Sequence, residues 1–221
     1  GIQTFVISRK KIKQLLNKLG KQMSKGQQVY WVCPLIEESE NIRLSNSNDR
    51  FGYLKKEFSE FKVGLIHGQM SSEDKECELK KYKGRKVDIL VSTTVIEVGI
   101  DNPNATVIVI ENANRFGLSQ LHQLRGRVGR GTEKSYCFLM YDGNLSDQAI
   151  QRLKTMRETQ DGFEIAERDM ALRGSGDLLG TMQSGHKIFK LSEVVEEPEL
   201  FLEANKLVQD TETLTYKQKL K

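Results

Sequence analysis

The 221-residue chain contains 38% hydrophobic and 29% charged residues, which is ordinary for a folded globular protein and excludes an intrinsically disordered chain. Its length allows one large domain, or a domain with a substantial appendage. No stretch approaches the roughly 18 apolar residues of a membrane span, and the N-terminus lacks the apolar core of a signal peptide. These features predict a cytoplasmic protein. Because the chain begins with Gly1 rather than Met, we expect it to be cut from something longer or processed.

Charged residues are distributed unevenly along the chain. Seven basic residues and no acidic residue lie between Arg9 and Lys25, and four arginines and no acidic residue lie between Asn112 and Thr132. The net charge of +4 fits a nucleic-acid partner but is mild enough to occur in proteins that bind none. A solvated helix face is the alternative explanation of the first run.

The three cysteines, Cys33, Cys77 and Cys137, are widely spaced and form no Cys-x-x-Cys pair. This spacing predicts reduced, buried thiols and no metal site.

Short apolar runs rich in β-branched residues alternate with longer amphipathic stretches, which is typical of βαβ units around a mostly parallel sheet. The runs show little in/out alternation, so we expect strands that are covered by helices on both faces. The predicted strands are 29–33, 63–66, 89–91, 107–110 and 137–140. The predicted fold class is therefore α/β.

The predicted helices are 9–23, 49–61, 71–82, 118–126, 145–159 and 163–172. Ser119 is expected to cap the fourth, which would place Gln123 and Arg127 one turn apart on one face. The polar segment 38–49 is predicted to be a loop, and the glycines of segment 173–180 are predicted to end the last helix. The strand–helix alternation stops near residue 145, so we expect a domain at 1–145 and a helical segment at 146–221.

The most informative stretch, residues 120–131, is QLHQLRGRVGRG. Arg125, Arg127 and Arg130 alternate with glycines, which places rigid bidentate donors at a helix end and turn where a phosphate can approach. An ordinary basic surface turn is the alternative. A second stretch, residues 88–103, is DILVSTTVIEVGIDNP, a buried strand that leads into a polar turn. Ligands of open α/β sheets bind at the carboxyl ends of strands, although a simple helix cap would explain this turn equally well.

Together, the two stretches resemble motifs V and VI of superfamily 2 helicases in order and spacing. Residues 29–34 stand where motif IV of that family lies, and His67-Gly68-Gln69-Met70 resembles the turn that these helicases place against the nucleic-acid backbone. The resemblance implies a RecA-like, P-loop NTPase-type lobe with a parallel sheet flanked by helices. It also implies that the lobe is the second of two motor lobes.

Two further segments narrow the resemblance to the RecG family of branched-DNA helicases. Residues 30–40, YWVCPLIEESE, resemble its form of motif IV. Residues 161–185 resemble the translocation motif, a helical hairpin and loop, that RecG shares with the transcription-repair coupling translocase. The resemblance implies a bacterial ATP-dependent DNA helicase that remodels Holliday junctions and stalled replication forks in recombination and repair.

The resemblance also implies roles for single residues. Arg127 and Arg130 are expected to reach the γ-phosphate of ATP, where fixed cations stabilise the charge of phosphoryl transfer. Nucleotide contacts are expected from Gln123, Gly99 and Asp101. The expected nucleic-acid contacts are Thr93, Thr94, His67 and Gly68, and the expected coupling residues are Arg168, Arg173 and Gln183. In the alternative interpretation, the glycines around Arg173 are only flexible turns.

The sequence contains no Gly-x-x-x-x-Gly-Lys-Ser/Thr loop and no Asp-Glu-x-His or Asp-Glu-x-Gln box. The resemblance therefore implies that the P-loop, the magnesium ligands and the domain that recognises branched DNA lie elsewhere in a full-length chain. This lobe alone is not expected to hydrolyse ATP. Two alternatives stay open: a free-standing nucleic-acid-binding module, and the corresponding lobe of the transcription-repair coupling translocase.

Overall fold

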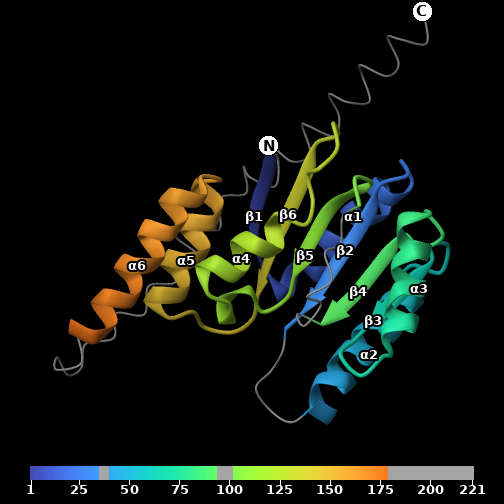
Figure 1. Ribbon diagram of the computed structural model, residues 1–221, viewed down its shortest axis with the longest axis horizontal. Helices are drawn as coiled ribbons and strands as arrows, with labels where there is room; N and C mark the ends of the chain where they lie inside the picture. The colour runs from blue at the N-terminus through green and yellow to red at the C-terminus, as the bar shows by residue number, and fades with distance from the viewer. Residues whose placement is uncertain (35–39, 94–101, 179–221) are drawn as a thin grey trace, which may run out of the picture. The chain divides into compact units, whose positions relative to one another are not determined.

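The computed structural model describes residues 1–34, 40–93 and 102–178, and all of the following refers to them. Their strands form one six-stranded sheet in the order β1-β6-β5-β2-β4-β3 (Figure 1). Each neighbouring pair is parallel, so the predicted α/β class with a parallel sheet is confirmed. The strands are β1 (Ile2–Ser8), β2 (Gln28–Cys33), β3 (Val63–Ile66), β4 (Ile89–Thr93), β5 (Ala105–Ile110) and β6 (Ser135–Tyr141).

Five of these strands coincide with the predicted apolar runs, and β1 was missed. It lies at the end of the strand order, beside β6, and only Thr4 and Ile7 of its residues are buried. β2, β4 and β5 are buried throughout. Polar Gln3 and Thr4 interrupt the apolar residues of β1, whereas β3, the other edge strand, is the unbroken run Val-Gly-Leu-Ile and was found.

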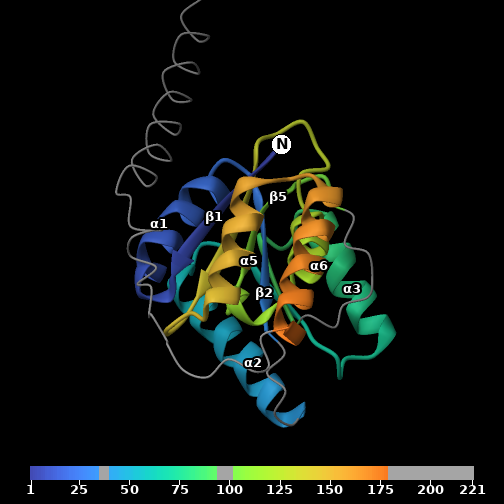
Figure 2. The ribbon, with the colours of Figure 1, turned by 90° about the vertical axis from the view of Figure 1, so that its left-hand side faces the viewer.

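Helices cover both faces of the sheet, as Figures 1 and 2 show. α1 and α2 cover one face, where Leu15 and Leu19 of α1 and Leu54 of α2 are completely buried. On the other face, α3, α4 and α5 contribute to one core cluster with Tyr30, Val32 and other residues of the interior strands. The helices are α1 (Ile12–Met23), α2 (Glu40–Glu57), α3 (Ser72–Lys83), α4 (Leu118–Arg125), α5 (Asp147–Glu158) and α6 (Gly162–Leu178), with two short 3-10 helices, η1 (Arg9–Lys11) and η2 (Ala113–Arg115).

Two helices extend beyond their predicted bounds. The expected loop at 38–49 is wrong, because α2 already begins at Glu40. This half of the helix is rich in Ser and Asn and lacks an apolar period, while the side chains that anchor it, Leu54 and Phe58, come later. α6 likewise continues to Leu178 through two glycines that were expected to end it. A glycine inside a helix costs only about 1 kcal/mol relative to alanine, so it does not have to break one.

All described residues belong to one compact unit. α5 contacts β1 and η2, and α6 contacts α4 and α5, so both helices extend the sheet domain. The boundary between residues 145 and 146 stays a prediction. In the described part of the chain, no helix is both long and apolar enough to cross a membrane.

The cysteines are all free thiols. Cys33 and Cys137 are buried, as predicted, but Cys77 of α3 is exposed. Burial raises the pKa of Cys137 to about 12, so this thiol stays protonated at neutral pH.

Candidate functional site

The arginine-rich stretch begins on α4 and continues into a turn. Gly117 caps the helix N-terminus, where its N–H donates to Oε1 of Gln120 (3.1 Å). The expected cap, Ser119, instead donates from its hydroxyl to Asp169 of α6 (3.0 Å). The helix ends at Arg125, so Arg127 lies in the following turn and does not share a helix face with Gln123 as predicted.

Glycines fix the turn that carries Arg127 and Arg130. Gly129 has a φ of +82°, and a Cβ at this position would lie 2.7 Å from Cγ1 of Ile2. A Cβ at Gly131 would lie 2.9 Å from the carbonyl oxygen of Pro103. Any other residue at Gly129 would be strained and would collide with β1. The turn is therefore held close to the sheet, with Arg127 half-buried and Arg130 exposed.

Arg125 is the structural member of the three arginines. Its side chain is buried and donates from Nη1 to the carbonyl oxygens of Met156 (2.8 Å) and Thr159 (2.9 Å). Nη2 lies 3.2 Å from Nδ1 of His122. Burial lowers the pKa of this guanidinium from its usual value. Arg125 thus joins the end of α4 to the end of α5, which supports the interpretation that it braces the motif.

A buried polar contact beneath Arg127 was not predicted. The hydroxyl of Ser92, on β4, donates to that of Tyr30, on β2, over 2.7 Å. Burial raises the pKa of Tyr30 to about 12, and the Ser92 hydrogen bond and the positive charge of Arg127 oppose that rise. This hydrogen bond joins β2 and β4, the strands of the motif IV and motif V segments, near Arg127.

The expected nucleic-acid residues lie at the carboxyl edge of the sheet as far as they are described. Thr93 is the buried last residue of β4, and His67 and Gly68 directly follow β3. The Gly68 carbonyl accepts a hydrogen bond from Nζ of Lys75 (3.0 Å). Partial burial and the nearby Lys75 lower the pKa of His67, so its imidazole is neutral at physiological pH. Thr94, Gly99 and Asp101 lie outside the described residues.

Of the expected coupling residues, Arg168 is the one whose side chain is described. It pairs with Glu158 at the end of α5 (3.1 Å) and with Glu164 of α6 (2.6 Å), and so holds the two helices together. The side chain of Arg173 and all of Gln183 lie outside the description. Asp169 of α6 accepts a hydrogen bond from the hydroxyl of Ser119 and so links this helix to α4.

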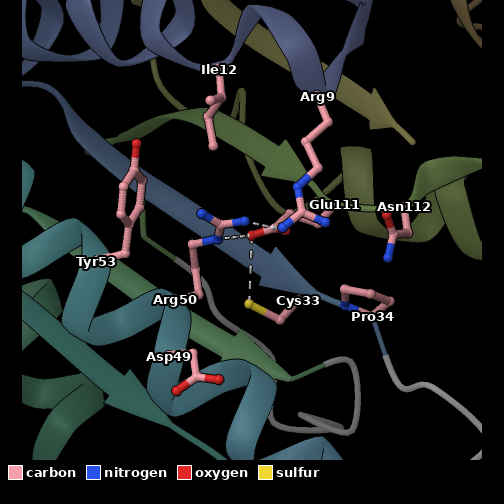
Figure 3. A pocket seen from close by; sticks show the side chains of 9 residues that line it. All are labelled: Arg9, Ile12, Cys33, Pro34, Asp49, Arg50, Tyr53, Glu111 and Asn112. Carbon is pink, nitrogen blue, oxygen red and sulfur yellow. Dashed lines mark hydrogen bonds and ion pairs between the residues drawn. The ribbon is translucent and has the colours of Figure 1, made fainter. Parts of the chain in front are cut away.

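A buried ion pair between α2 and the end of β5 was also missed (Figure 3). Glu111 accepts bonds from both Nε and Nη2 of Arg50, and from Nε1 of Trp31 (2.5 Å). The pair borders a cavity of about 460 Å³ at the carboxyl edge of the sheet, which Arg9, Cys33, Pro34 and Asn112 also line. In the sequence, the one indication of this ion pair was an acidic residue, Glu111, directly after the apolar run 107–110.

Chemically, the described residues offer cationic and hydrogen-bonding groups rather than a metal site. They contain no group of three or more His, Cys, Asp or Glu side chains placed to hold an ion. Arg127 and Arg130 are instead suited to an anion, because guanidinium groups donate to phosphate oxygens in a fixed geometry. At the sheet edge, Thr93 and the Gly68 turn suit contacts with a phosphate backbone.

Comparison with known proteins decides the family. The sequence pattern described as "Helicase conserved C-terminal domain" matches residues 9–132, which is more than half of the chain. The chain belongs to this family. A second pattern, "ATP-dependent DNA helicase RecG, domain 3, C-terminal", matches residues 159–213. The resemblance to superfamily 2 helicases of the RecG type is thus confirmed.

Curated relatives extend this similarity over most of the chain. The chain is 49% identical over 209 residues to the ATP-dependent DNA helicase RecG of Synechocystis sp., covering 94% of this chain and 25% of the relative. It is 44% identical over 197 residues to the RecG of Bacillus subtilis, covering 89% of this chain and 29% of that relative. The chain therefore spans between a quarter and a third of the length of these relatives.

Solved structures confirm the RecA-like fold. A structure of RecG bound to a three-way DNA junction matches with a TM-score of 0.67 and 40% identity, covering 90% of this chain and 25% of that one. Domain 2 of the DEAD-box helicase Mss116p, bound to an RNA duplex, matches with a TM-score of 0.55 and 18% identity, covering 77% and 68% of the two chains. The second match is similar in fold alone.

Proposed function

We propose that this chain is the second motor lobe of an ATP-dependent DNA helicase that remodels branched DNA, such as Holliday junctions and stalled replication forks, in recombination and repair. The observation that carries the proposal is the turn after α4, in which Gly129 and Gly131 pack closely against Ile2 and Pro103 and which carries Arg127 and Arg130. A lobe that only bound nucleic acid would not need two arginines spaced for the γ-phosphate of ATP. The similarity to a RecG bound to a three-way junction supports branched DNA as the substrate.

In this proposal, ATP and magnesium bind between this lobe and a first lobe that carries the P-loop and the magnesium ligands. When bound, ATP supplies the γ-phosphoryl group whose transfer to water drives the motor. Arg127 and Arg130 donate hydrogen bonds to the phosphoryl oxygens and stabilise their developing charge. Gln123, on the last turn of α4, contacts the nucleotide from the same segment, and Gly99 and Asp101 complete that contact.

The DNA partner lies along the carboxyl edge of the sheet, at Thr93, Thr94, His67 and Gly68. A displacement of the arginine turn is transmitted to α5 and α6. Arg125 connects α4 to α5, and Arg168 connects α5 to α6. Arg173 and Gln183 continue this coupling. The proposal places the full-length protein, with a branch-recognition domain, in the cytoplasm of a bacterium, since the relatives described above are bacterial.

DNA-stimulated ATP hydrolysis by the full-length protein that carries this lobe tests the proposal. We expect hydrolysis to rise severalfold on addition of a synthetic three-way junction, and less on addition of a linear duplex of equal length. The 221-residue chain alone is the matched control and is expected to show no hydrolysis with either DNA. Tight junction binding by the full-length protein without any hydrolysis would favour the binding-module alternative.

A further inference from the structure

α1 and the residues that flank it carry exposed positive charge that the motor mechanism does not use. Lys13 and Lys21 of α1, Lys10 of η1 and Lys25, which follows α1, are exposed, and together they form what we call the basic face. None of the four is ion-paired with a carboxylate in the described part of the chain. The segment from Arg9 to Lys25 contains no acidic residue at all.

Folding leaves these charges unbalanced. The first turn of α1 contains no acidic side chain, although the positive end of the helix dipole favours one there. Lys10 and Lys13 instead add positive charge to that end of the helix, which repels the dipole. The apolar residues Leu15, Leu16, Leu19 and Met23 account for the stability of α1, because they are buried against the sheet. The basic face therefore has no evident structural role.

The basic face begins at the same carboxyl edge of the sheet as the proposed DNA contacts, but it follows β1, at the other end of the strand order from β3 and β4. Arg9 directly precedes Lys10 and lines the cavity at the carboxyl edge of the sheet, with Cys33 and Pro34 at the end of the motif IV strand (Figure 3). From there α1 runs along the sheet face opposite the one that α3, α4 and α5 cover. A polyanion at the carboxyl edge could thus continue onto the basic face without meeting the nucleotide side of the lobe.

We propose that the basic face of α1 binds the phosphate backbone of a duplex arm of the branched DNA, as a second contact outside the motor cleft. The twelve residues of α1 span about 18 Å, the length of about five base pairs of duplex. Gln14 and Asn17 lie among the lysines on the exposed side and add neutral donors for phosphate oxygens. This inference rests on the proposed function, because it extends the DNA path of that motor.

An anionic membrane surface is a poorer partner for the same charges. Helices that lie on a membrane insert an apolar face beside their lysines. The apolar face of α1 is already buried in the protein core, and its exposed side is polar. Phosphate groups on a rigid duplex require only the charge and the hydrogen-bond donors.

The test compares two triple variants of the full-length protein. In the first, Lys10→Gln, Lys13→Gln and Lys21→Gln remove charge from the basic face. In the matched control, Lys56→Gln, Lys83→Gln and Lys86→Gln remove the same charge from exposed positions on α2, on α3 and after α3. Binding to a three-way junction with long duplex arms is measured between about 50 and 200 mM salt.

Each phosphate contact contributes about 0.9 to the slope of log affinity against log salt concentration. We expect the basic-face variant to lose about 2 to 3 from this slope, and the control variant to keep the slope of the unmodified protein. Equal changes in both variants would reflect bulk charge alone and would overturn the inference, as would an unchanged slope in the first variant.

Failure of the basic-face inference can be distinguished from failure of the proposed motor function. If the full-length protein does not hydrolyse ATP but its DNA binding still depends on the α1 lysines, the motor proposal fails and the basic face stands. If ATP hydrolysis responds to DNA while the salt slopes of all three proteins agree, the basic face fails and the motor stands.

Discussion

Replacing Arg127 with alanine in the full-length protein is expected to lower DNA-stimulated ATP hydrolysis by a factor of about 10³ or more. Arg127 lies in a turn that Gly129 and Gly131 pack closely against Ile2 and Pro103. Because the charge that it stabilises develops during phosphoryl transfer, the loss should appear in kcat. DNA affinity without nucleotide should stay within about twofold, since the expected DNA contacts lie at the carboxyl edge of the sheet.

Arg115→Ala is the matched control for this variant. Arg115 is exposed on η2, near the same segment, and its loss changes the net charge equally. We expect its ATP hydrolysis to equal that of the unmodified protein. Hydrolysis at the unmodified rate by Arg127→Ala would show that Arg127 does not act on the nucleotide.

The second large effect is on folding, and it concerns Arg125. Arg125→Met is expected to lower the free energy of unfolding by about 3 kcal/mol, because the buried carbonyl oxygen of Met156 and the partly buried one of Thr159 lose a charged donor. Methionine fills a similar volume, so the change reports mainly on the hydrogen bonds. Urea denaturation of the 221-residue chain, followed by circular dichroism, measures this difference.

Arg125→Lys separates the charge from the geometry of these bonds. Lysine keeps a positive charge but lacks the planar fork, so we expect it to recover only part of the lost stability. Arg115→Met serves as the exposed control and should change stability by less than about 0.5 kcal/mol. A value this small for Arg125→Met would mean that the bonds to α5 do not brace α4.

Much of the sheet could be predicted from local pattern. The interior strands β2, β4 and β5 can be recognised in the sequence as apolar runs, because helices cover them on both faces. β1 was not predicted because polar Gln3 and Thr4 interrupt its apolar residues. The first half of α2 was not predicted because its helix is anchored by residues further along the chain, a tertiary effect that a local window does not contain.

The residues of the candidate site also divide into those that the sequence predicts and those that only the folded chain reveals. The glycine-separated arginines were recognisable from their spacing, but the different role of Arg125 became clear only from its partners on α5. The ion pair between Arg50 and Glu111 joins residues that are 61 positions apart, and the contact between Tyr30 and Ser92 joins residues that are 62 apart. No local pattern links such residues, so only the folded chain reveals them.

ATP-dependent strand release from a synthetic three-way junction, by the full-length protein, tests the central claim most directly. A fluorescent label on one arm reports its separation over time, and a non-hydrolysable ATP analogue provides the control. We predict release with ATP and magnesium, none with the analogue, and none by the Arg127→Ala variant at matched DNA binding. Junction binding at high affinity with no release under any nucleotide condition would contradict the account of this chain as a lobe of a branched-DNA motor.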